Sequence, residues 1–155
     1  RHGKGEVAVK LLGCWMLAGA IFFIADDAEL TKKDLRKMQG EWACSEMIRD
    51  GNKLEPDDAQ AYFRSVQGES YTISKYRKVL GTGTIKIDAG KTPREIDAQP
   101  ALQGAKLQKG IYEWDGDKLK IIFGPAGGDR PKDFKAAPGS QRAYTLWERE
   151  KGGNQ

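Results

Sequence analysis

From residue 41 to residue 149 the sequence consists of short runs of alternating apolar and polar residues, separated by turns rich in Gly, Pro, Asn and Asp. Alternation with a period of two is typical of strands that have one buried face. No helical pattern in the chain is long enough to cover a parallel sheet, so we expect the strands to pair antiparallel. Strands are predicted around residues 42–48, 71–73, 79–87, 96, 111–114, 119–123 and 142–149.

The turn between two of these runs supports a hairpin meander. Asp115-Gly116 predicts a tight type I′ turn, because this dipeptide tolerates positive φ. A meander of seven or eight strands has two exposed edges unless it closes on itself. We therefore predict an all-β fold with two short helices, in which the strands form an antiparallel up-and-down β-barrel.

Two short helices are predicted next to the strands. Thr31 followed by Asp34 forms a capping-box pattern, and apolar residues recur there at near-helical spacing until Gly40. A second helix is predicted over residues 56–66. Pro56 suits its first position, and it carries an apolar stripe made of Ala59, Tyr62, Phe63 and Val66.

The first 25 residues have the pattern of a secretory signal peptide. Residues 1–10 are net positive, and residues 11–25 are uncharged and too few to span a bilayer, which takes roughly 20. An uncleaved anchor and a buried helix remain as alternatives. We predict export to the periplasm, the cell envelope or the medium, with a short helix and linker at 26–40, a barrel at 41–150 and a flexible tail at 151–155.

Composition narrows the classes of function. The chain has 26 Lys and Arg against 22 Asp and Glu, and setting aside the three bases and one acid of the leader leaves a charge of only +2. Nucleic acid is therefore not an expected partner. His2 and Cys14 lie in the leader, so beyond it the only thiol is Cys44 and there is no His. Beyond residue 25 this excludes a disulfide, a His-dependent nucleophile and a Cys/His zinc site. We expect no catalytic residue, metal or cofactor.

Gly40-Glu41-Trp42 stands where the first predicted strand begins, and it resembles the Gly-x-Trp signature of lipocalins. The resemblance implies that the glycine allows a tight turn into the strand and that the indole closes one end of the barrel. The last strand of an up-and-down barrel lies antiparallel beside the first. We therefore expect Arg149 to cover the indole of Trp42, a contact worth about 0.5 to 2 kcal/mol.

A closer resemblance covers roughly residues 36–149. Several motifs resemble, in order and spacing, a family of lipocalin-like domains from planctomycete bacteria that commonly follow a signal peptide: LRKMQGEW at 35–42, RDG at 49–51, GTGTIKID at 81–88, GIYE at 110–113, DGD at 115–117, RPKDF at 130–134 and PGS at 138–140. The resemblance implies a lipocalin-like barrel and an exported location, and it carries no activity over to this chain. Compared with lipocalins the domain is short, lacks a disulfide pair and shows no helix after the last strand, which argues against a large, deep cavity.

Candidate ligand-binding residues are those predicted to face the barrel interior or its mouth. A carboxylate inside the barrel would orient a ligand, but a bulge that reverses the alternation would leave the same group in solvent. Aromatic side chains would line a pocket, or they would simply fill the core. In lipocalin-type barrels the segment after the first strand covers the mouth, so helix 56–66 is a lid candidate. The candidates are Glu46, Tyr62, Phe63, Ile73, Ile85, Tyr112, Trp114 and Tyr144.

Residues 124–141 contain three prolines and four glycines and predict a long irregular loop. We expect Phe134 to anchor this loop to the barrel. Arg130 and Asp133 would form an ion pair that holds the loop in place. Alternatively, they would present an exposed contact to an acidic partner.

The sequence favours a binding protein over the other classes. Our first hypothesis is a barrel that binds a small, mainly apolar ligand without chemical turnover. The alternative is a packed structural or interaction module that acts on a cell-envelope protein, with membrane contact only through an uncleaved leader. An apolar cavity of the order of a few hundred Å³ would distinguish the first from the second.

Overall fold

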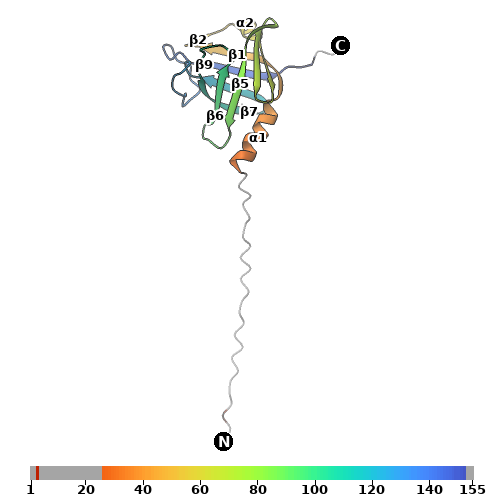
Figure 1. Ribbon diagram of the computed structural model, residues 1–155, viewed down its shortest axis with the longest axis vertical. Coiled ribbons are helices and arrows are strands. Elements are labelled where there is room, and N and C mark those ends of the chain that lie inside the picture. Colours follow the sequence, from red (N-terminus) through yellow and green to blue (C-terminus); the bar gives the residue numbers. More distant parts are fainter. Residues whose placement is uncertain (1–2, 4–25, 153–155) are drawn as a thin grey trace.

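The computed structural model describes residue 3 and residues 26–152. The predicted signal peptide, apart from Gly3, and most of the predicted tail at 151–155 therefore lie outside the described residues. The described chain forms one barrel with a helix at one end (Figure 1).

Nine strands form one antiparallel sheet, and eight of them close into a barrel because β1 pairs with both β3 and β9. The two-residue strand β2 pairs only with the end of β1. This confirms the predicted all-β class with two short helices and an up-and-down barrel. The strands are β1 (Gly40–Arg49), β2 (Asn52–Lys53), β3 (Tyr62–Gln67), β4 (Ser70–Lys75), β5 (Lys78–Asp88), β6 (Arg94–Pro100), β7 (Gln108–Asp115), β8 (Lys118–Phe123) and β9 (Ala143–Arg149).

The hairpin between β7 and β8 lies where the sequence predicts it, but with a different turn. Its loop residues are Gly116 and Asp117, and of these only Gly116 has positive φ. A type I′ turn needs positive φ at both positions, so the predicted turn type is wrong.

A β-bulge in β1 decides which side chains face the interior. The pairing between β1 and β9 shifts register between Cys44 and Glu46. Trp42 and Cys44 are buried before the bulge and Met47 after it, so the alternation is reversed and Glu46 faces outward. The Glu46 carboxylate therefore does not lie inside the barrel, where it would orient a ligand. The bulge turns it towards solvent.

Trp42 closes the barrel at the end where β1 begins. Its side chain is fully buried, and its Nε1 donates a hydrogen bond to the carbonyl oxygen of Met38 at 2.8 Å. The guanidinium carbon of Arg149 lies 4.1 Å from the centre of the indole, and its nitrogens donate to the carbonyl oxygens of Lys37 and Gln39. Gly40 has φ +101°, so glycine is the residue that suits the turn into β1.

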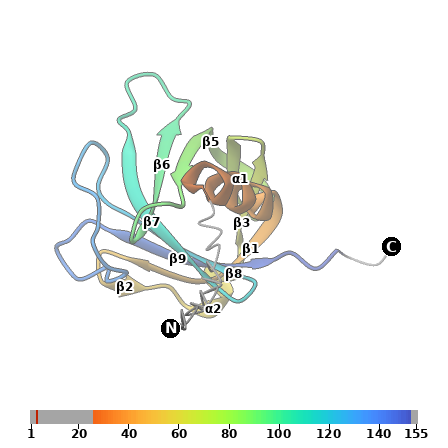
Figure 2. The ribbon, with the colours of Figure 1, turned by 90° about the horizontal axis from the view of Figure 1, so that it is seen from below.

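Helix α1 (Asp27–Met38) lies across this closed end of the barrel (Figure 2). The helix begins five residues before the predicted capping box, because Asp26 is its N-cap and accepts a hydrogen bond from the Ala28 amide. The predicted capping role of Thr31 and Asp34 is therefore wrong.

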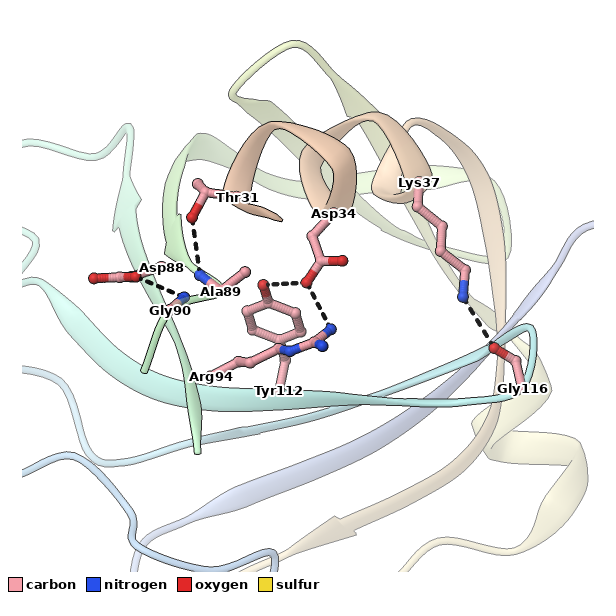
Figure 3. Close-up of polar contacts among 9 residues, drawn as sticks. All are labelled: Thr31, Asp34, Lys37, Asp88, Ala89, Gly90, Arg94, Tyr112 and Gly116. Atoms are coloured by element: carbon pink, nitrogen blue, oxygen red, sulfur yellow. Dashed lines mark hydrogen bonds and ion pairs between the residues drawn. The ribbon is translucent and has the colours of Figure 1, made fainter. Parts of the chain in front are cut away.

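Thr31 and Asp34 instead hold α1 to the barrel (Figure 3). The Thr31 hydroxyl accepts a hydrogen bond from the Ala89 amide at 3.0 Å. Asp34, which is only 6% exposed, accepts from the Tyr112 hydroxyl at 2.8 Å and from Arg94 Nη1 at 2.9 Å. The buried carboxylate is thus paired, as a buried charge must be if it is not to destabilise the fold.

The second helix is shorter than predicted. Helix α2 (Pro56–Gln60) ends before Tyr62, and residues 62–67 form β3, which pairs with β1 on one side and β4 on the other. Side chains in β3 alternate, with Tyr62, Arg64 and Val66 buried. The predicted helix 56–66 is therefore wrong over its second half. The spacing of its apolar residues is compatible with either structure, and only the two neighbouring strands decide between them.

The long loop 124–142 packs on the outer face of β7, β8 and β9. Phe134 lies against a second buried cluster that includes Ile111, Ile122 and Tyr144. This second cluster explains how outward-facing residues of the barrel come to be buried.

Arg130 and Asp133 do not pair with each other, contrary to prediction. Arg130 pairs with Asp97 at 2.7 Å and Glu95 at 3.3 Å on β6. Asp133 pairs with Arg142 at 3.3 Å. Both side chains hold the loop in place, but each finds its partner outside the motif.

Candidate ligand-binding site

The two halves of the barrel interior differ in packing. Next to α1 the interior is filled by side chains that are at most 1% exposed, namely Met38, Trp42, Val66, Ile85, Ile96, Tyr112, Leu119 and Ile121. Towards the opposite end, where β1 ends and β9 begins, a cavity of about 330 Å³ remains. Small-molecule sites span about 300 to 1,000 Å³, so this one has room for a small ligand only.

Half of the residues that line the cavity are apolar. Six apolar residues from β1, β4, β6, β8 and β9 contribute to it, namely Met47, Ile73, Ala98, Phe123, Ala143 and Trp147. Burying a ligand against such a wall gains about 25 cal/mol per Å² of apolar surface removed from water. The wall surrounds the cavity on several sides, because it draws on strands from around the barrel.

Small residues at inward positions leave the space open. Ala98 and Ala143 line the cavity without filling it. Gly83 makes room for the ring of Tyr71, since a Cβ at this glycine would lie 2.7 Å from the ring. The shape of the cavity therefore depends on which inward positions carry small side chains.

Arg64 brings a positive charge to the cavity from β3. Its side chain lines the cavity although the residue is only 4% exposed. Its Nη2 has no hydrogen-bond partner among the described residues. The ring of Tyr71 lies beneath it, with the ring centre 5.2 Å from the guanidinium carbon. Burial lowers the pKa of Arg64 from 12.5 to about 10, so the group remains charged at pH 7.

Further positive charge gathers around Tyr62 at the open end. The guanidinium carbon of Arg49 lies 5.3 Å from the centre of the Tyr62 ring, and Nζ of Lys75 lies 5.1 Å from it. The described residues that line the cavity include Arg49 and Arg64 but neither Asp nor Glu. The cavity therefore has a positive potential, which favours anions.

Two of the eight predicted candidates line the cavity, namely Tyr62 and Ile73. Tyr62 does so from a strand and not from a lid helix. The hypothesis of a lid formed by residues 56–66 therefore does not hold in its predicted form.

Three candidates lie on the outside of the barrel. Glu46 pairs with Lys53 at 3.4 Å, because the bulge in β1 turns it outward. Phe63 alternates with Tyr62 and lies under Arg77, whose guanidinium carbon is 3.8 Å from its ring centre. Tyr144 belongs to the outer cluster covered by the long loop.

The other three candidates lie in the closed half of the barrel. Ile85 and Tyr112 are core residues. Trp114 lies with its ring centre 6.1 Å from that of Trp42, and Lys37 Nζ is 4.0 Å from its ring. None of these three residues lines the cavity at the open end. Tyr112 and Trp114 instead border a separate, open pocket of about 300 Å³ next to Arg94.

The prediction missed Arg64, which is the most unusual residue of the site. The sequence did contain a sign of it. In a strand, Tyr62, Arg64 and Val66 share one face, so a charged residue stands between two apolar ones on the buried side. A strand assigned to residues 62–67 would have placed this charge inside the barrel. The helix assignment placed it on a solvated face instead.

No family model, curated protein or solved structure gives a significant match to this chain. Within residues 26–152, no helix combines the length and the apolar character needed to cross a bilayer. No group of three or more His, Cys, Asp and Glu side chains in that part of the chain is arranged to hold a metal ion.

Proposed function

We propose that this protein binds a small, mainly apolar ligand in the open half of its barrel, without chemical turnover. The observation that carries the proposal is the cavity of about 330 Å³ between Met47, Ile73, Phe123 and Trp147. A barrel of eight strands is narrow enough for side chains to fill it, as they do in the closed half. A barrel with a purely structural role has no need of the space that remains at the other end.

The side chains around the cavity support binding and not catalysis. General acid–base chemistry near neutral pH needs a group that titrates there. Arg64 keeps its proton at neutral pH, since its pKa is about 10, and burial raises the pKa of Tyr71 above its usual value. Neither residue therefore acts as a base at pH 7.

Export is part of the proposal, and it rests on the leader pattern of residues 1–25. Fractionation of cells that express the full chain tests it. We expect the domain outside the cytoplasm and shortened by cleavage near Ala25 or Ala28. A cytoplasmic product that retains all 25 residues would contradict export.

A second candidate is an interaction module, favoured by exposed apolar side chains on the turn between β4 and β5, on the first residues of β5 and on the connection between β6 and β7. Tyr76 and Val79 are each 65% exposed, Leu80 is 60% and Leu102 is 74% exposed. Exposed apolar groups of this kind mark protein contact sites when they are contiguous. A module that works only through these residues binds no small molecule.

Titration with 1-octanol separates the two candidates. Trp147 lines the cavity, so its fluorescence should change as octanol fills the space, and native mass spectrometry should show one molecule per chain. Ala143→Phe fills the cavity and should abolish the signal. Ala126→Phe, at an exposed loop position, is the matched control and should leave it unchanged. Equal titrations for the wild type and Ala143→Phe would show that octanol does not occupy this cavity.

A further inference from the structure

We propose that the ligand of this cavity is an anion, namely a compact amphiphile with a carboxylate head group that pairs with Arg64. This inference rests on the proposed function and names the class of ligand. The apolar body of the ligand lies against Met47, Ile73 and Phe123.

The first argument is that Arg64 lacks the carboxylate partner that Arg94 and Arg130 have. Arg94 pairs with Asp34 at 2.9 Å, and Arg130 pairs with Asp97 at 2.7 Å. Arg64 is only 4% exposed, yet its Nη2 has no partner among the described residues. A buried charge without a partner opposes folding. Such a residue is expected where the partner arrives from outside the chain.

The second argument is that packing alone does not account for an arginine at this position. The contact with the ring of Tyr71, at 5.2 Å from the guanidinium carbon to the ring centre, gives Arg64 no hydrogen bond, and Nη2 has no partner among the described residues. A methionine would fill the same space without the cost of burying a charge. The feature that only arginine supplies is the planar set of donors, which matches a carboxylate through two parallel hydrogen bonds.

The third argument concerns depth and charge. Arg64 is in register with Trp42 on β1 and Ile73 on β4, two residue pairs deeper in the barrel than the pair formed by Tyr62 and Lys75. A head group bound at Arg64 therefore lies deep, and the apolar body extends along the wall towards the mouth. Arg49 and Lys75 at the rim attract the anion, and no carboxylate of the described lining residues repels it.

A monoanion suits this site better than a more highly charged head group. Among the described residues that line the cavity, Arg64 is the one deeply buried cation, while Arg49 is exposed at the rim. One guanidinium neutralises one carboxylate. A phosphate dianion would keep an uncompensated charge in the apolar part of the cavity.

The test compares octanoate with 1-octanol, which have the same alkyl chain length and differ in charge. Isothermal titration of the full chain at pH 7 measures both affinities. We expect octanoate to bind at least tenfold more tightly, since a hydrogen bond to a charged group is worth about one to two decades of affinity. In Arg64→Gln and Arg64→Met this preference should disappear, with the affinity for octanol changed less than about threefold. Lys86→Gln removes an exposed charge on the outside of β5 and should leave both affinities unchanged.

Arg64→Lys keeps the test informative if Arg64→Gln or Arg64→Met does not fold. It keeps the positive charge but loses the planar set of donors. Its affinity for octanoate should fall between those of the wild type and Arg64→Gln. The comparison of the two probes on the unmodified protein needs no variant at all. Equal binding of octanoate and octanol would overturn the anion proposal and leave the proposed function standing. An octanoate preference that persists in Arg64→Gln would overturn the assignment to Arg64. If neither probe binds, both proposals fail.

Discussion

The indole of Trp42 is the side chain whose removal should destabilise the barrel most. It is fully buried, donates to the Met38 carbonyl at 2.8 Å and is covered by Arg149 at 4.1 Å. Replacing a buried Trp by Ala costs about 3 to 5 kcal/mol, because the cavity left behind closes only in part. The lost hydrogen bond and cation contact place Trp42→Ala near the upper end of this range. Trp42→Phe keeps most of the packing and should cost only about 1 to 2 kcal/mol, mainly for the unpaired Met38 carbonyl.

Urea unfolding of the full chain, followed by far-ultraviolet circular dichroism, measures these changes in the free energy of unfolding. Tyr76→Ala is the matched control, since this aromatic side chain is 65% exposed, and it should change stability by less than about 0.5 kcal/mol. Combining Trp42→Ala with Arg149→Ala should reveal a coupling of about 0.5 to 2 kcal/mol. A Trp42→Ala protein as stable as Tyr76→Ala would refute the role of Trp42 in closing the barrel.

Two further predictions concern buried groups. Asp34→Ala leaves the Tyr112 hydroxyl and Arg94 without their partner and should cost about 2 to 3 kcal/mol in the same urea assay, whereas Asp117→Ala in an exposed turn should change little. Burial raises the pKa of the Cys44 thiol from 9.0 to about 12, so at pH 8 iodoacetamide should modify Cys44 far more slowly than free cysteine, as read by peptide mass spectrometry. The raised pKa also means that the stability due to the neutral thiol is complete below pH 9 and is lost as the pH rises towards 12. Modification of Cys44 at the rate of free cysteine would show that it is not buried.

The class of fold could be predicted from the sequence because its signals are local. Alternation with a period of two marks strands wherever one face is buried, and turn residues such as Asp115-Gly116 mark where strands end. The position of Trp42 after Gly40 also follows from neighbouring residues. Its contact with Arg149 needs only one further step, namely that the last strand lies beside the first.

The side chains that line the cavity could not be predicted in the same way. Residues 62–67 are compatible with a helix or a strand, and they form a strand because β1 and β4 supply hydrogen-bonding partners on both sides. That choice decides whether Arg64 lies inside the barrel or in solvent. The bulge after Cys44 decides the same question for Glu46.

The sequence by itself therefore determined that this chain forms an antiparallel barrel, and it indicated which indole closes one end. Tertiary structure alone decided which charge lies inside. Along a strand the orientation of a side chain depends on parity, and one bulge or one reassigned segment reverses the parity of every residue that follows. The partners that set this parity lie far away in the chain, beyond the reach of local patterns.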